Sequence, residues 1–136
     1  MTIRAWAIAI AVVISGTVAA GPAKLATDDV VRTEMKAIRD LTVNAYTLVT
    51  HRRMGVADAR AYHAKIKASV ERIKTGTEVT GEAREEIEKL AGYIEKGASA
   101  VAGLDQIEPI DGMLIVDDSL SVYAARFDHP GWQPLR

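Results

Sequence analysis

The chain has 136 residues and a net charge of −1, and 49% of its residues are hydrophobic and 26% charged. This length suits one domain, and this composition excludes a disordered or collagen-like protein. The near-zero charge offers no basic surface for nucleic acid. The sequence has no Cys, which excludes thiol nucleophiles, disulfides, thiolate metal sites and covalent haem attachment. Only 5% of the residues are aromatic, and the many Ala, Lys and Glu residues favour helices.

The first twenty residues have the layout of a secretory signal peptide. Arg4 is a short positive region, residues 5–14 are an unbroken apolar run, and Val18 and Ala20 place small residues before a cleavage site. An uncleaved membrane anchor is the alternative, but the apolar stretch is shorter than the roughly 20 residues that span a bilayer. We therefore predict a cleaved leader, residues 1–20, and an exported domain, residues 24–136, in the periplasm of a Gram-negative host.

Two amphipathic helices are predicted in the first half of this domain, because apolar residues recur there at spacings of three and four. The first spans residues 28–53 behind a cap offered by Thr27, Asp28 or Asp29, with the apolar stripe Val31, Met35, Ile38, Leu41, Ala45 and Leu48. Gly55 separates it from the second, residues 56–74, whose inner seam is Val56, Ala59, His63, Ile66, Val70 and Ile73.

Two more helices follow. The third begins after Thr80 and ends near residue 102, with the stripe Ala83, Ile87, Leu90, Ile94, Gly97 and Val101. The fourth begins near Pro109, a favoured first helical position, with the stripe Met113, Val116, Leu120, Tyr123 and Phe127. Residues 129–136 form an irregular tail. Because short connections make neighbouring helices antiparallel, we predict an all-α, up-down-up-down four-helix bundle.

The sequence predicts no enzyme active site. Carboxylate di-iron bundles need Glu-x-x-His pairs, and neither His51 nor His63 has a Glu three residues before it. No Gly-rich phosphate loop, Ser-centred elbow or His-Glu-x-x-His motif occurs. We therefore expect a protein that binds rather than catalyses.

His63 stands alone on an otherwise apolar seam, roughly level with Tyr46 of the first helix. We predict that it is a core histidine whose ring nitrogen bonds the Tyr46 hydroxyl or the Asn44 amide. A ligand-binding or pH-sensing histidine is the alternative.

A basic cluster ends the first predicted helix: His51, Arg52 and Arg53. Cations at a helix C-terminus complement its dipole, which explains them structurally. The alternative is contact with an anion or a partner at that pole of the bundle.

Met35 and His129 are the candidate cofactor ligands. In an up-down-up-down bundle, the start of the first helix and the end of the fourth meet at one pole. A thioether and an imidazole there could be axial ligands of haem b, as in cytochrome b562-type bundles, or hold copper. However, Pro130 disfavours helical geometry at His129. The alternative is that Met35 fills the core and residues 128–132 form a C-terminal clasp, with Trp132 folded over the pole.

The two ends of the domain resemble small exported bacterial proteins labelled DnrO-like. The matching runs are KLATDDVVRTEMKAIRD and YAARFDHPGWQPL, and the matching residues are Ala26, Thr27, Asp28, Arg32, Met35, Ile38 and Arg39, with residues 127–132. The resemblance implies export and a helical fold, but no established activity. It also places Met35 and the pair Asp128-His129 in one motif set. The chain lacks the His-rich segment that some such proteins carry after the leader, which argues against metal scavenging.

We therefore expect a periplasmic, non-enzymatic helical-bundle protein that binds a small ligand or another exported protein. The candidate contacts are His51, Arg52, Arg53, His63 and Trp132. A haem or copper carrier that uses Met35 and His129 is the second hypothesis, and a structural or stress-related accessory protein is the third.

Overall fold

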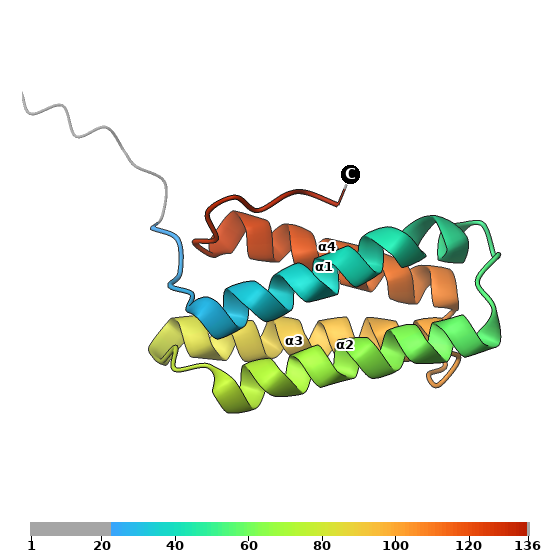
Figure 1. Ribbon diagram of the computed structural model, residues 1–136, viewed down its shortest axis with the longest axis horizontal. Coiled ribbons are helices and arrows are strands. Elements are labelled where there is room, and N and C mark those ends of the chain that lie inside the picture. Colours follow the sequence, from blue (N-terminus) through green and yellow to red (C-terminus); the bar gives the residue numbers. More distant parts are fainter. Residues whose placement is uncertain (1–22, 136) are drawn as a thin grey trace, which may run out of the picture.

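The computed structural model describes residues 23–135, so the predicted leader, residues 1–20, lies outside the described residues. Four helices make up this part of the chain: α1 (Asp29–Thr50), α2 (Val56–Gly76), α3 (Gly81–Val101) and α4 (Pro109–Arg126). Each runs antiparallel to the one before it, and α4 returns to pack beside α1 (Figure 1). The predicted all-α four-helix bundle is confirmed. None of these four helices is long and apolar enough to cross a membrane.

Local chemistry fixes both ends of α1. Asp28 is its N-cap, and its Oδ1 accepts a hydrogen bond from the Val31 N–H at 2.9 Å. At the other end the Arg52 N–H donates to the Val49 carbonyl at 3.0 Å and the Arg53 N–H donates to the Leu48 carbonyl at 2.7 Å. This pair of bonds is a Schellman motif. It ends α1 three residues before the predicted boundary at residue 53.

The core lies along the bundle axis, and α3 and α4 bury every residue of their predicted stripes. In α1 and α2 the buried face is shifted. Thr42 and Val49 replace the predicted Leu41 and Leu48 in α1, and Leu48 is 39% exposed. The buried residues of α2 are Ala59, Tyr62, Ile66, Ser69, Val70 and Ile73.

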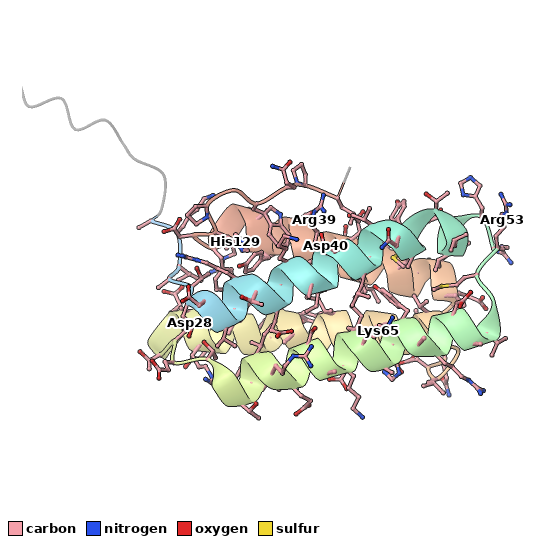
Figure 2. The ribbon with its side chains drawn as sticks, viewed as in Figure 1. Asp28, Arg39, Asp40, Arg53, Lys65 and His129 are labelled. Atoms are coloured by element: carbon pink, nitrogen blue, oxygen red, sulfur yellow. The ribbon has the colours of Figure 1, made fainter. Side chains whose placement is uncertain are left out.

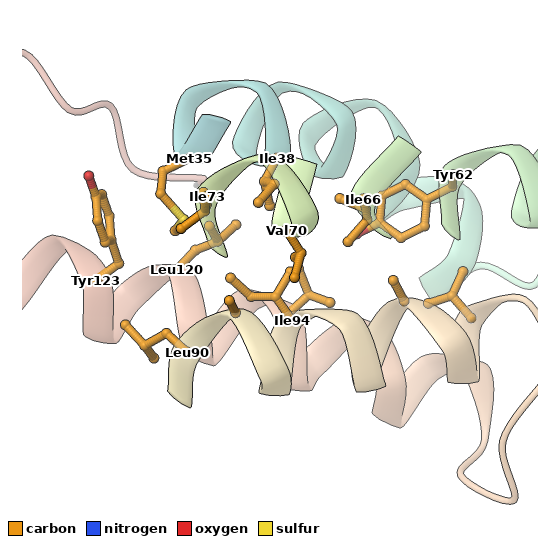
Figure 3. Close-up of a cluster of buried hydrophobic side chains, with 14 of the residues drawn as sticks. Met35, Ile38, Tyr62, Ile66, Val70, Ile73, Leu90, Ile94, Leu120 and Tyr123 are labelled. Carbon is orange, nitrogen blue, oxygen red and sulfur yellow. The ribbon is translucent and has the colours of Figure 1, made fainter. Parts of the chain in front are cut away.

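The predicted core position of His63 is therefore wrong, and Tyr62 occupies that place on α2 (Figure 3). Val56, the other incorrectly assigned seam residue, is 68% exposed. The Tyr62 hydroxyl lies 2.9 Å from Thr42 Oγ1, and Thr42 itself donates to the Ile38 carbonyl at 2.8 Å. Each hydroxyl satisfies the other, so both can be buried without an unpaired polar atom. Burial raises the pKa of Tyr62 to about 12.

The backbones of α3 and α4 approach each other most closely at Gly97 and Gly112. A Cβ atom built on Gly97 would lie 2.5 Å from the Gly112 carbonyl oxygen, and one on Gly112 would lie 2.6 Å from the Ala100 Cβ. Side chains larger than hydrogen at either position would force the two helices apart. This contact joins α3 and α4 into one closely packed layer.

We predict that Gly112→Ala destabilises the protein by about 1–3 kcal/mol, because overpacking outweighs the better helix propensity of Ala. Gly92→Ala is the matched control on α3, since no atom lies within 4 Å of its added Cβ. It should stabilise the protein by roughly 0.5–1 kcal/mol. Urea denaturation followed by circular dichroism measures both. Equal stability of the two variants would contradict the close approach.

Candidate functional site

The two ends of the described chain bind each other at one pole of the bundle. Leu25 pairs with Phe127 in a parallel bridge, and the Asp128 N–H donates to the Leu25 carbonyl at 2.9 Å. Thr27 Oγ1 donates to the Asp128 carbonyl at 2.5 Å and accepts from Arg32 Nε at 2.7 Å. We call residues 24–28 and 127–132 the clasp. It joins the start of α1 to the end of α4.

An aromatic cluster completes the clasp. The buried Tyr123 hydroxyl lies 2.7 Å from His129 Nδ1. The Trp132 ring lies edge-on to both, with centroids 4.9 Å from Tyr123 and 5.0 Å from His129. Trp132 therefore folds back onto the end of α4, as the clasp interpretation of the sequence predicts. Beyond it, Arg39 Nε donates to the Gln133 carbonyl at 2.8 Å and holds the tail against α1.

The predicted ligands Met35 and His129 have other contacts here. Met35 is fully buried in the hydrophobic core, near Ile73 and Leu120 (Figure 3). His129 lies at the end of α4, and Tyr123 occupies its Nδ1. These contacts are those of a core residue and a clasp residue. Among residues 23–135, no group of three or more His, Cys, Asp or Glu side chains could hold a metal ion. The haem or copper hypothesis stays a prediction that no contact in this structure favours.

The clasp alters the protonation of its histidine. Burial lowers the pKa of His129, the positive charge of Arg32 lowers it further, and the charge of Asp128 opposes them. Burial likewise raises the pKa of Tyr123. The tyrosine thus stays a neutral hydroxyl, and neutral His129 is the form that the folded clasp favours.

His63 faces a different part of the molecule from the one predicted. It is half-buried and lines a shallow groove between α2 and α3 with Lys67, Glu95 and Asp105. This groove lies between α2 and α3, whereas the predicted partners Tyr46 and Asn44 belong to α1.

The opposite pole contains a cavity of about 530 Å³, between the α1–α2 turn and the α3–α4 loop. Figure 2 shows the two poles apart, with His129 at one end of the bundle and Arg53 at the other. Ligand sites in proteins have volumes of roughly 300–1,000 Å³ and mostly apolar walls. The walls here fit that description, with the apolar lining Val49, Met54, Val56, Ala59, Val101 and Ile110.

Three charged side chains also line this cavity: Arg52 at the end of α1, and Glu108 and Asp111 at the start of α4. All three residues are exposed. Within residues 23–135, none of their side chains has an ion pair or a hydrogen bond. The apolar cavity therefore has unpaired charges of both signs beside it.

Arg52 is held in an unusual conformation. Its φ of 56° is left-handed, and it is the only non-glycine residue among those described with a positive φ. Glycine normally occupies this position of a Schellman motif, and an L-residue there costs roughly 1–2 kcal/mol. Such strain gathers at functional sites. Of the predicted basic cluster, Arg52 is the residue that reaches the cavity, whereas His51 Nδ1 lies 2.9 Å from the Thr47 carbonyl of its own helix.

Sequence reasoning missed the acidic and apolar residues that α4 contributes to the cavity. Ile110 lies three residues before Met113 and extends the predicted stripe of α4 by one turn, so it looks like an ordinary core residue, and Glu108 and Asp111 fit the ordinary pattern of an acidic helix start. No sequence signal marks Val56 as part of the site, because its apolar spacing assigned it to the inner seam and its exposure is a feature of the structure.

Comparison with family models, with curated protein sequences and with solved structures gave no match to this chain. The resemblance of its ends to DnrO-like proteins therefore stays a prediction.

We predict that stability falls as the pH drops below about 6.5, the ordinary pKa of histidine, because the unfolded chain then takes up a proton that folded His129 resists. The contribution of neutral His129 is fully present above that pH. In the chain without residues 1–20, Trp132 is the sole tryptophan, so its fluorescence can follow the unfolding of the protein at each pH. His129→Gln should abolish the loss of stability below about pH 6.5, and His63→Gln should leave that loss in place. A His129 pKa above 6.5 would contradict this account.

We also predict that Arg52→Gly stabilises the protein by roughly 1 kcal/mol, because glycine adopts the left-handed conformation without strain. Arg53→Gly is the control, since Arg53 has no positive φ and its replacement gains no such relief. Urea denaturation of both variants measures the difference. A loss of stability in Arg52→Gly would show that this position is not strained.

Proposed function

We propose that this chain is a non-enzymatic helical-bundle protein that binds a small amphipathic molecule in the cavity between the α1–α2 turn and the α3–α4 loop. The observation that carries the proposal is strained Arg52 at the edge of an apolar cavity of ligand size. A conformation that glycine would adopt without strain is held here by a residue with a long cationic side chain that lines the cavity. A guanidinium in this place is suited to contact an anionic group of a ligand.

The arrangement of the two poles supports the same proposal. The clasp pole is closed by hydrogen bonds and ring contacts, whereas the cavity pole has apolar walls and charges without partners in the described chain. Sites between the helices of bundles are a common place for ligands. We further propose that the protein acts outside the cytoplasm, in the periplasm of a Gram-negative host, because residues 1–20 have the pattern of an export signal.

Binding of the neutral apolar dye N-phenyl-1-naphthylamine, excited directly, tests the proposal. Ala102 lines the cavity and Val56 is exposed at its edge, so Ala102→Trp and Val56→Trp should each narrow the space and reduce the rise in dye fluorescence. Ala64→Trp, on the exposed face of α2, is the matched control and should bind as the unmodified chain does. No dye binding, or equal binding by all four proteins, would contradict the proposed site.

A further inference from the structure

The charges beside the cavity come from two different helices. Arg52 follows the last turn of α1, Glu108 is the N-cap of α4, and Asp111 lies in the first turn of α4. Opposite charges that line one cavity could neutralise each other by forming an ion pair. Within the described chain they form no such pair, so the guanidinium of Arg52 and the carboxylates of Glu108 and Asp111 are free to bind a ligand.

A ligand with a single charge would match these three charged side chains poorly. A carboxylate that binds Arg52 would stand near two acidic side chains, and an ammonium that binds the acids would stand near the guanidinium. A molecule that carries both groups can place its carboxylate on Arg52, where a bidentate bond is available, and its ammonium on Glu108 or Asp111. Each charge of such a molecule then meets a side chain of opposite charge beside the cavity.

The walls require the rest of the ligand to be apolar. Val49, Val101 and Ile110 line the cavity, and burial of apolar groups against such residues favours binding. We infer that the cavity binds zwitterions with an apolar body, of the class of apolar amino acids and short apolar peptides. This inference rests on the proposed function, and it adds the ligand's charge pattern to it.

A purely structural explanation of the same charges makes a different prediction. Arg52 at a helix C-terminus and acids at a helix N-terminus each complement a helix dipole. If that were their whole role, removing them would change stability and leave ligand preference unchanged. The strain at Arg52 argues against this explanation, because a cation with an ordinary φ would serve the dipole as well.

Calorimetric titration with three matched probes tests the inference: leucyl-leucine, its N-acetyl form and its C-terminal amide. The first is a zwitterion, the second keeps only the carboxylate and the third keeps only the ammonium. We expect leucyl-leucine to bind at least about tenfold more tightly than either blocked form, since each loses a charge-assisted hydrogen bond.

Two variants assign the preference to residues. Arg52→Gly should remove the difference between leucyl-leucine and its amide, and the double variant Glu108→Gln with Asp111→Asn should remove the difference between leucyl-leucine and its acetylated form. Arg53→Gly should keep both differences.

Equal binding of the three probes would overturn the inference, as would dye binding without binding of any dipeptide. Both outcomes leave the proposed cavity function standing. Failure of the dye itself to bind would instead overturn the proposed function.

Discussion

One carboxylate, that of Asp28, fixes the arrangement on which the rest of the bundle depends. Its Oδ1 caps α1 through the Val31 N–H, and its Oδ2 accepts from Thr77 Oγ1 and from the Glu78 N–H, both at 2.8 Å, in the α2–α3 connection. Burial would raise the pKa of Asp28, but these hydrogen bonds outweigh it and lower the pKa. The start of α1 is thereby tied to the connection between the end of α2 and the start of α3. Thr27, next to Asp28 in the chain, is placed to bind the Asp128 carbonyl.

The stripes of α3 and α4 could be predicted from the sequence in full, because apolar residues at helical spacing make up most of each buried face, although α4 also buries Asp117 and Ser119. The faces of α1 and α2 could not. Thr42 and Tyr62 are buried as a pair that satisfies its own hydrogen bonds, and a pattern of apolar residues gives no indication of such a pair. Counting only apolar spacing therefore placed Leu48 in the core instead of Val49, and His63 in the core instead of Tyr62. Each error is a shift of one residue along its helix.

The candidate site likewise has parts that could be predicted from the sequence and parts that could not. The sequence indicated the basic end of α1 and the aromatic tail, because both are local features. It could not indicate the cavity, because that space exists only where two connections far apart in the chain, before Val56 and before Pro109, meet at one pole. Nor could it reveal the left-handed Arg52, since the Schellman bonds that impose this φ form only when α1 stops at Thr50.

The two walls of the cavity differ in how far they can adjust to a ligand. Val101 and Ile110 stand beside the contact of Gly97 with Gly112, where the α3 and α4 backbones touch and leave no space for movement. The facing wall is the α1–α2 turn, which contains the strained residue Arg52. Strain lowers the free energy needed to leave a conformation, so under the proposed function we expect any change of shape on binding to fall on this turn rather than on α3 and α4. The bundle thus pairs a rigid apolar wall with a turn that carries the cation.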